Sequence, residues 1–418
     1  MKGINLGGCI MKILIPTMGT RGDIQPYIAL ARELINSGFE VTIATHPCWK
    51  GLIESYNVRF MSLGPDIDIE YETAYIRGDS KNWIIGMIRT MRFVFKIIEK
   101  STFEIKSLCS DVDLVIASHS NIGAIEAEAS GIPFISVTLQ PDVIPKKLEK
   151  KSKMKVVLDK FIGVLINPFM VAPYNKLRKI HGLKKISSFD QLQSSLLNII
   201  PISPLICPPN NFWEEKNKAV GYWFVDESID YKPDNLLMNF IESGPPPIII
   251  SLGAMGFESK EEKSKLDILI NSINKTKMRA IIQGFNKTLE NYKLGENIIA
   301  IGSVPHTWLF KYGYCIIHHG GMGTTATAIY SGVPSIVIPH ITDQYFWANR
   351  VYELKVGPKS IPSKDLSVDT LVNAINLVKN DYEQFDNSAK ALAEKIKAEN
   401  GLANAVELIK NIVDLQKN

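Results

Sequence analysis

The sequence predicts an α/β protein built from two Rossmann-like domains, each with a doubly wound parallel sheet, that face a central cleft. Three observations predict this fold. The chain has 418 residues, too many for one ordinary hydrophobic core. Short apolar runs alternate with glycine-containing loops and helical patterns in both halves. The alternation breaks near the middle, where three prolines occupy 245–247.

The first half opens with the apolar run KILIP at 12–16, a glycine-containing loop and a helical pattern that ends at Gly38. The run VTIAT at 41–45 follows at once, which is typical of a unit that builds a parallel sheet. Further strands are expected at 113–118, 133–137 and 196–200. The first half is therefore a doubly wound domain.

The second half repeats this rhythm. Its apolar runs lie at 248–253, 279–284, 298–302, 314–321 and 335–339, with a polar helix near 258–273. Open parallel sheets bind ligands at the carboxyl ends of their strands. Two such sheets therefore predict a binding cleft between the domains.

The expected organisation has five segments. Residues 1–10 form an extension before the first strand, 11–225 the amino-terminal domain, 226–246 a linker, 247–395 the carboxyl-terminal domain, and 396–418 a helix that returns to the amino-terminal domain.

Composition excludes several classes of protein. The sequence has no signal-peptide pattern and no apolar run long enough to cross a bilayer. Five scattered cysteines without a CxxC pair argue against a disulfide framework and a zinc site, and favour the cytoplasm. A net charge of +4 is too small to imply a nucleic-acid partner.

The most informative segment is YCIIHHGGMGTT at 314–325, in which a buried strand runs through a glycine cluster into a helix. The glycines let the backbone approach a ligand, and the first N–H groups of a helix attract an anion. His319 precedes the glycines and can donate to the same anion. The alternative is that Gly320, Gly321 and Gly323 only form a tight turn. The pattern favours a diphosphate.

The segment HHGGMGTT, followed by SGVPSIVIPHITDQYFWANRV, closely resembles the donor signature of the family 1 glycosyltransferases. The resemblance continues in GPPPIIISLGAMG, VPHTWLF, GYWF and the amino-terminal TMGTRGDIQPYIALA, and so spans both halves. It is strongest to the sterol glucosyltransferase and antibiotic aglycone branches. It implies the GT-B fold, with nucleotide in the carboxyl-terminal domain and acceptor in the amino-terminal domain.

Carried over by position, the resemblance assigns the diphosphate to His319, Gly321, Gly323 and Thr324. It assigns the hydroxyls of the donor sugar to Asp343 and Gln344, whose oxygen and amide groups suit a vicinal diol. A helix N-cap is the alternative role for Asp343. The resemblance also assigns Gly253 to the donor site and Val304 to the nucleotide base. Further donor candidates are Trp308, Gly320 and Thr342. Core packing is the alternative for Trp308.

The candidate general base is Asp23, in GTRGDIQP, where plant and animal members of the family have a histidine. The alternative is that Asp23 caps the following helix. Neighbouring Thr20, Arg21 and Gly22 are further candidates for the site, and the alternative for Arg21 and Gly22 is that they shape the turn. His119 and Trp83 are candidates for lining the acceptor pocket.

The resemblance implies an inverting, metal-independent transfer of a hexose from a nucleotide diphosphate sugar, with UDP-glucose as the expected donor. The acceptor would be a hydroxyl of a small apolar molecule such as a sterol, lipid or natural-product aglycone. No cofactor is expected beyond the sugar nucleotide. Asp111 and Asp113 spell a metal motif, but they stand at the amino end of a strand, where a turn is the better interpretation. The alternative function is a non-catalytic sugar-nucleotide sensor or partner subunit.

Twelve Lys or Arg and two acidic residues fall between 145 and 185, interleaved with apolar residues. One hypothesis is peripheral binding to the anionic inner face of a membrane. The alternative is a solvated basic face on a helix that covers the core.

Overall fold

The computed structural model describes residues 10–67, 69–78, 83–139, 171–209, 213–225, 231–253, 259–289 and 292–417. The chain divides into two compact units. The first unit contains Met1–Val225 and Asn400–Asn418, and the second contains Asp226–Glu399. Each unit has one parallel sheet, so the predicted α/β architecture is confirmed. Every helix among the described residues is too short or too polar to span a bilayer.

The sheet of the first unit has the strand order β3-β2-β1-β4-β5-β6-β7. Its strands are β1 (Lys12–Pro16), β2 (Glu40–Thr45), β3 (Arg59–Ser62), β4 (Leu114–Ala117), β5 (Phe134–Val137), β6 (Asn198–Ile200) and β7 (Asn217–Ala219). The five runs expected from the sequence are all strands. The two outermost strands, β3 and β7, were not predicted, because they are short and incompletely buried and so have no apolar run.

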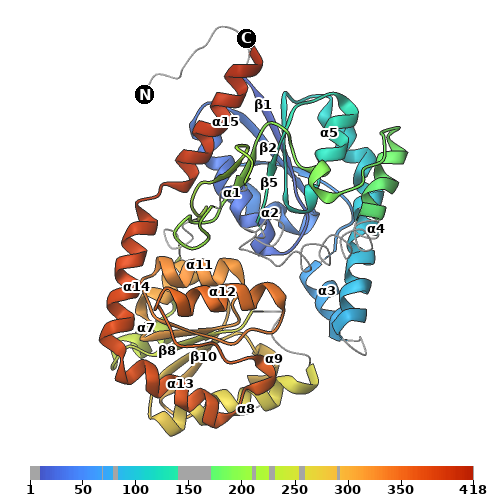
Figure 1. Cartoon of the computed structure of the whole chain (residues 1–418). Coiled ribbons are helices and arrows are strands. Elements are labelled where there is room, and N and C mark those ends of the chain that lie inside the picture. Colours follow the sequence, from blue (N-terminus) through green and yellow to red (C-terminus); the bar gives the residue numbers. More distant parts are fainter. Residues whose placement is uncertain are drawn as a thin grey trace, which may run out of the picture. The chain divides into compact units, whose positions relative to one another are not determined.

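Helices cover both faces of this sheet (Figure 1). They are α1 (Arg21–Asn36), α2 (Lys50–Ser55), α3 (Ile69–Gly78), α4 (Trp83–Cys109), α5 (Ala124–Ser130) and α15 (Gly401–Lys417). Leu14 of β1 and Val115 of β4 pack with Ile105 of α4 and Ile125 of α5 in one buried cluster. The helices α1 and α15 contact each other within the same unit.

The sheet of the second unit has the order β10-β9-β8-β11-β12. Its strands are β8 (Ile248–Ser251), β9 (Ala280–Gln283), β10 (Ile298–Ile301), β11 (Cys315–His318) and β12 (Ser335–Val337). Its helices are α7 (Asn235–Glu242), α8 (Ser259–Thr276), α9 (Asn286–Leu289), α10 (His306–Leu309), α11 (Met322–Tyr330), α12 (Thr342–Glu353), α13 (Val368–Asn380) and α14 (Tyr382–Lys397). Side chains of α8 and α13 pack on one face, and those of α7, α10 and α11 on the other. All five predicted strands are present.

The predicted linker at 226–246 is wrong in part, because it contains α7. Asp234 caps this helix by accepting a hydrogen bond from the Leu237 N–H at 2.7 Å. Leu237 and Phe240 are buried in the core of the second unit. The flanking prolines and acidic residues obscure the short apolar pattern of α7 in the sequence.

The last helix, α15, is fixed to the first unit at its amino end. The indole N–H of Trp223 donates to the carbonyl of Gly401 at 3.3 Å, and the amide of Asn404 donates to the carbonyl of Val220 at 3.0 Å. A β-carbon at Gly401 would lie 2.5 Å from the carbonyl carbon of Gly221. Glycine is therefore required where the helix meets this backbone.

His318, the last residue of β11, is a core residue. Its side chain is fully buried, and its Nδ1 accepts a hydrogen bond from the Gly320 N–H at 3.1 Å. Burial lowers the pKa of His318 to about 3. The imidazole is therefore neutral at physiological pH and holds the turn that follows the strand.

We predict that Gly401→Ala lowers the free energy of unfolding by about 1–3 kcal/mol, because the added methyl group overpacks the contact with Gly221. Chemical denaturation measures the loss, and hydrogen exchange should show faster exchange in α15. Gly51→Ala is the matched control, because a β-carbon at Gly51 in α2 meets no heavy atom within 4 Å. Equal stability of the two variants would contradict the packing argument.

We also predict that His318 makes the protein less stable in acid. The unfolded imidazole takes up a proton near pH 6.5, whereas the folded one does so only near 3. The unfolded state binds more protons between these values, so stability falls as the pH falls, by up to about 1.4 kcal/mol per pH unit. The gap in unfolding free energy between wild type and His318→Asn should narrow from pH 7 to pH 5. A difference in unfolding free energy that stays constant between pH 7 and pH 5 would contradict the low pKa of His318.

Candidate functional site

Both sheets reverse their strand order at one position. The chain builds β1, β2 and β3 outward and then places β4 on the other side of β1; it builds β8, β9 and β10 and then places β11 beside β8. At such a reversal the crossover connections leave in opposite directions, and a crevice remains beyond the carboxyl ends of the two strands. The predicted site residues Asp23, His119, Gly253 and His319 follow these four strands.

In the first unit, Asp23 lies in the first turn of α1. The carboxylate Oδ2 accepts hydrogen bonds from the backbone N–H of Thr20 at 2.9 Å and from its hydroxyl at 3.0 Å. Thr20, with extended backbone, is the N-cap, and Asp23 is the third helical residue. The alternative that Asp23 is itself the N-cap is therefore corrected, although it does satisfy the cap residue.

The second carboxylate oxygen of Asp23 faces His119. The distance between Oδ1 and the His119 Nε2 is 3.5 Å, and both side chains are partly exposed. The sequence predicted His119 only as a residue lining the acceptor pocket. Since β1 and β4 are neighbours, the fold instead places its imidazole beside the candidate base.

Tyr27 positions His119. The Tyr27 hydroxyl accepts the backbone N–H of His119 at 2.8 Å, and the two rings stack with centroids 6.2 Å apart. Ser120 and Asn121 both have positive φ, which turns the chain sharply after His119. Burial, with a contribution from the charge of Asp23, raises the pKa of Tyr27. Tyr27 is therefore a neutral structural support.

The other candidates in this unit lie around the same turn or outside the described side chains. Arg21 and Gly22 are the first two residues of α1 and are exposed. Trp83 begins α4, and its side chain is outside the described part of the structure. Asp113 accepts the backbone N–H of Lys12 at 2.7 Å, at the amino end of the sheet.

In the second unit, glycines surround His319 for steric reasons. A β-carbon at Gly321 would overlap Nε2 of His319, and one at Gly253 would lie 3.0 Å from its Cε1. Gly320 has φ of +86°, and a β-carbon there would lie 3.0 Å from the carbonyl oxygen of Gln344. Burial lowers the pKa of His319 to about 4. The imidazole is neutral in the free protein and is held by contacts with backbone.

The helix α11 begins directly after this turn, with Gly321 as its N-cap. The first N–H groups of a helix have no partner inside the helix. A β-carbon at Gly323 would meet no atom within 4 Å, so open space lies beside the first turn. Gly323 and Thr324 therefore present backbone donors at a helix N-terminus, which suits a diphosphate.

The helix α12 begins at Thr342, and Asp343 lies in its first turn. Asp343 is therefore not the N-cap. Gln344 is buried, and its Oε1 accepts the backbone N–H groups of His340 at 2.7 Å and Ile341 at 3.3 Å. Both bonds use the side-chain oxygen of Gln344, which caps the start of α12. The side chain of Thr342 lies outside the described part.

Both candidate residues of the predicted base-binding turn, Val304 and Trp308, are buried in the core of the second unit. The carbonyl of Val304 accepts the side-chain amide of Gln283 at 2.9 Å. Trp308 is buried with Val304 and Phe310, and its ring meets the ring of Tyr231 at 5.1 Å. The core alternative therefore holds for Trp308.

His340 follows β12, and the sequence did not predict it as a site residue. Burial, with a further contribution from the charge of Lys265, lowers its pKa to about 4. The His340 imidazole is therefore neutral at physiological pH. Its position directly after a predicted strand could have identified it as a candidate. The sequence argument used the neighbouring residues 342–344 instead.

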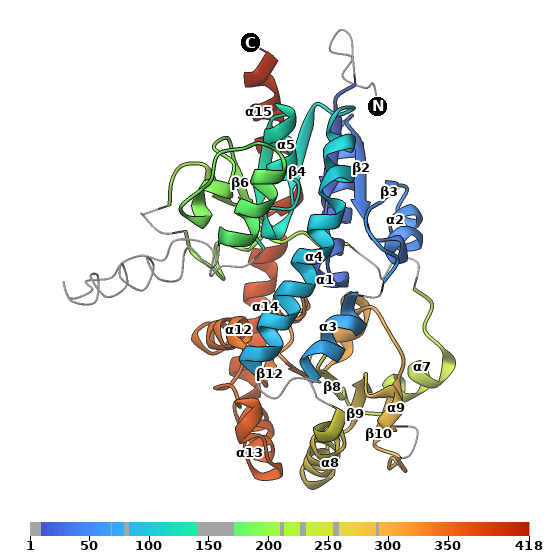
Figure 2. The ribbon, with the colours of Figure 1, turned by 90° about the vertical axis from the view of Figure 1, so that its right-hand side faces the viewer.

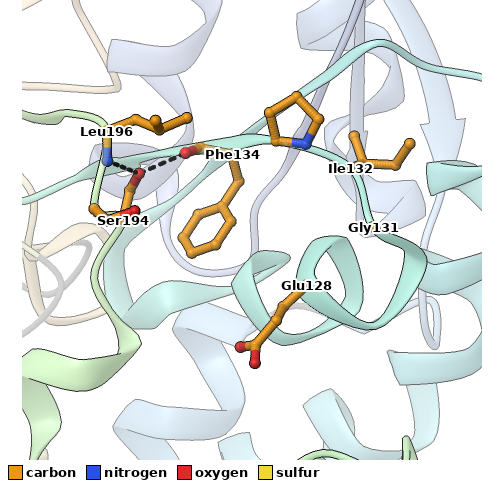
Figure 3. Close-up of a pocket in the computed structure, with 8 residues that line it drawn as sticks. Glu128, Gly131, Ile132, Phe134, Ser194 and Leu196 are labelled. Atoms are coloured by element: carbon orange, nitrogen blue, oxygen red, sulfur yellow. Dashed lines mark hydrogen bonds between the residues drawn. The ribbon is translucent and has the colours of Figure 1, made fainter.

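A hollow of about 590 Å³ lies elsewhere in the first unit (Figure 3). Gly131, Ile132 and Phe134 line it at the start of β5, together with Ser194 and Leu196 before β6. The Ser194 hydroxyl donates to the carbonyl of Phe134 and accepts from the N–H of Leu196 (Figure 3). This hollow is at the amino ends of the strands, and so it is separate from Asp23 and His119.

Two family domains match the chain. Residues 13–147 match the glycosyltransferase family 28 N-terminal domain, and residues 269–415 match the erythromycin biosynthesis protein CIII-like C-terminal domain. A sterol 3-beta-glucosyltransferase of Arabidopsis thaliana is 29% identical over 95% of the chain and 67% of that protein. A sterol 3-beta-glucosyltransferase of Candida albicans is 29% identical over 97% of the chain. The chain spans only 28% of the length of that relative.

Solved structures share the fold. The glycotransferase of kitacinnamycin has a TM-score of 0.74 at 17% identity, covering 97% of this chain and 100% of that chain. The calicheamicin glycosyltransferase CalG4 has a TM-score of 0.72 at 17% identity, covering 97% and 99%. The Streptomyces glycosyltransferase SsfS6, complexed with thymidine diphosphate, has a TM-score of 0.67 at 18% identity, covering 96% and 99%. The chain is therefore a glycosyltransferase of the GT-B fold, homologous to the sterol 3-beta-glucosyltransferases and to antibiotic glycosyltransferases.

Proposed function

We propose that the protein transfers a hexose from a nucleotide diphosphate sugar to a hydroxyl group of a small apolar acceptor, with inversion at the anomeric carbon and without a metal ion. The observation that carries this proposal is the pair formed by Asp23 and His119 beyond β1 and β4. A carboxylate held by a neighbouring imidazole at the edge of a parallel sheet is suited to accept a proton from a hydroxyl.

In this mechanism the two carboxylate oxygens of Asp23 have different roles. Oδ2 is occupied by Thr20, which fixes the carboxylate, and Oδ1 takes the proton of the acceptor hydroxyl. As that proton leaves, the acceptor oxygen forms a bond to the anomeric carbon, and the bond between this carbon and the diphosphate oxygen breaks. The nucleotide diphosphate departs with the bonding electrons. His119 is a positioning residue that orients Oδ1.

The segment after β11 supports the donor half of the proposal. Backbone N–H groups of Gly323 and Thr324 at the start of α11, with His319 beside them, would hold the diphosphate and stabilise the charge that develops on it. Gly253 leaves room for the His319 ring. Asp343 and the amide of Gln344 would bind sugar hydroxyls, and Val304 would contact the nucleotide base through its backbone.

The relatives named sterol 3-beta-glucosyltransferase favour UDP-glucose as donor and a sterol-like or lipid acceptor. A pyrimidine diphosphate also agrees with the thymidine diphosphate complex of SsfS6. The basic stretch that suggested contact with an anionic cytoplasmic membrane falls largely in residues 140–170, outside the described part. We keep that contact, and a cytoplasmic location, as part of the proposal.

The alternative is a sugar-nucleotide sensor without catalysis. A sensor needs the donor segment alone, whereas this chain also pairs Asp23 with His119 in the other unit. Mass spectrometry of mixtures of sugar nucleotides and apolar acceptors separates the two functions. A sensor would bind the nucleotide sugar and yield no glycosylated acceptor.

We predict that Asp23→Asn lowers kcat by about 10²–10⁴-fold while the Kd for UDP stays unchanged, because only the proton acceptor is lost. Asn still offers an oxygen to Thr20, so the variant preserves the start of α1. His119→Gln should lose less activity than His119→Leu, since the Gln amide can donate to Asp23. Initial rates and calorimetry give both values, and wild-type turnover by Asp23→Asn would rule out the assigned base.

We predict the opposite pattern for the donor residue. His319→Ala should raise the Kd for UDP by about 10–100-fold, the loss of one hydrogen bond to a charged group. Isothermal calorimetry with UDP measures this change, and Asp23→Asn is its control. If both variants bound UDP as the wild type does, His319 would not contact the diphosphate.

A further inference from the structure

Trp49 contacts the turn that carries Asp23. It lies after β2, between a short 3-10 turn at Pro47–Trp49 and α2. The strand β2 pairs with β1, and α2 lies against β3 at the edge of the same sheet (Figure 2). The half-buried indole of Trp49 donates its N–H to the carbonyl of Gly19 at 3.2 Å.

The carbonyl that Trp49 contacts belongs to the same peptide unit as the N–H that holds Asp23. A peptide unit is planar and trans, so the C=O of Gly19 and the N–H of Thr20 point in opposite directions. The C=O accepts from Trp49 at 3.2 Å, and the N–H donates to Oδ2 of Asp23 at 2.9 Å. One rigid unit therefore links the indole to the carboxylate.

Gly19 lets this peptide unit lie against the carboxylate and also makes it easy to rotate. Its φ is +147°, which favours glycine, and a β-carbon there would overlap Oδ2 of Asp23. A residue without a β-carbon opposes rotation of its peptide least. If the unit turned over, the carbonyl oxygen of Gly19 would face the carboxylate in place of the Thr20 N–H. The Trp49 hydrogen bond opposes this rotation, because the turned unit would lose it.

Two further hydrogen bonds hold the turn without Trp49. The backbone N–H of Thr17 donates to the carbonyl of Ala44 at 2.9 Å, and the Thr17 hydroxyl donates to the carbonyl of Asp23 at 3.3 Å. These bonds fix the start and the end of the turn. Removal of the Trp49 donor should therefore leave the turn folded and release only the peptide between Gly19 and Thr20.

The position of one carboxylate oxygen depends on the other. Thr20 fixes Oδ2 through its N–H and its hydroxyl, and Oδ1 then lies 3.5 Å from Nε2 of His119. Without the N–H donor only the hydroxyl would hold Oδ2, and the carboxylate would be free to rotate away from His119. Hydrogen bonds in a chain also strengthen one another by polarisation. We propose that Trp49 is a positioning residue that orients Asp23 through the peptide between Gly19 and Thr20.

This proposal rests on the proposed role of Asp23 as the base, and its test separates the N–H of Trp49 from its bulk. Trp49→Phe keeps an aromatic ring without a donor. Trp49→His is smaller, but its five-membered ring can place an N–H where the indole N–H stood. Trp49→Phe should lower kcat by about 3–10-fold, the loss of one neutral hydrogen bond, and leave the Kd for UDP unchanged. Trp49→His should retain more activity. Equal activity of the two variants, or higher activity of Trp49→Phe, would overturn the proposal.

The matched control is Trp223→Phe. The indole of Trp223 donates to the carbonyl of Gly401 at 3.3 Å, so this variant loses an equivalent bond at the start of α15 and should keep the wild-type kcat. Chemical denaturation verifies that both Phe variants are folded. In the Asp23→Asn background, Trp49→Phe should cause no further loss of kcat, because the base is already absent. An equal loss in both backgrounds would make the role of Trp49 purely structural.

Hydrogen exchange of the Thr20 amide, measured by NMR, tests the inference without turnover. This amide should exchange faster in Trp49→Phe than in the wild type and in Trp49→His. If the wild type transferred no sugar, the proposed function would fail, whereas this exchange pattern would still show that Trp49 holds the peptide beside Asp23. Unchanged exchange in Trp49→Phe would overturn the inference.

Discussion

One topological constraint, the reversal of strand order within each parallel sheet, places Asp23, His119, Gly253 and His319. Crossover connections that leave in opposite directions cannot cover the carboxyl ends of both central strands. In the first unit this exposes the residues after β1 and β4, and in the second unit those after β8 and β11. Asp23 and His119 meet for this reason, as do Gly253 and His319.

Steric exclusion explains the glycines of the donor segment better than flexibility does. At Gly320 and Gly321 a side chain would collide with neighbouring atoms, whereas at Gly323 it would project into open space. Gly321 therefore leaves room for the His319 ring, and Gly320 lets the backbone lie against Gln344 and Val337. The third leaves a helix N-terminus open to a ligand. A short motif thus combines rigid support with an accessible helix N-terminus.

Asp23 shows how one side chain can serve two roles. A capping residue stabilises the start of a helix, and such a role normally competes with reactivity because it stabilises the carboxylate. Here the capping bonds involve only Oδ2, and Oδ1 remains beside His119. Gln344 also uses only one of its polar atoms in capping. Its side-chain oxygen caps α12, and its amide nitrogen takes no part in these bonds. Helix caps therefore orient the polar groups on both units.

The sequence by itself predicted ten of the twelve strands of the two sheets and the candidate site residues that follow them. Buried strands are continuous apolar runs, so ten strands were visible, and the segment at 314–325 with the glycines beside His319 indicated a diphosphate site. The short strands β3 and β7 and the helix α7 were not visible, because partly exposed edges and a proline-rich context carry no strong pattern. Only the tertiary structure decided that His119 lies beside Asp23, that Trp308 belongs to the core, and that the indole of Trp49 donates to Gly19. These features arise from contacts between residues far apart in the chain, and local periodicity does not record such contacts.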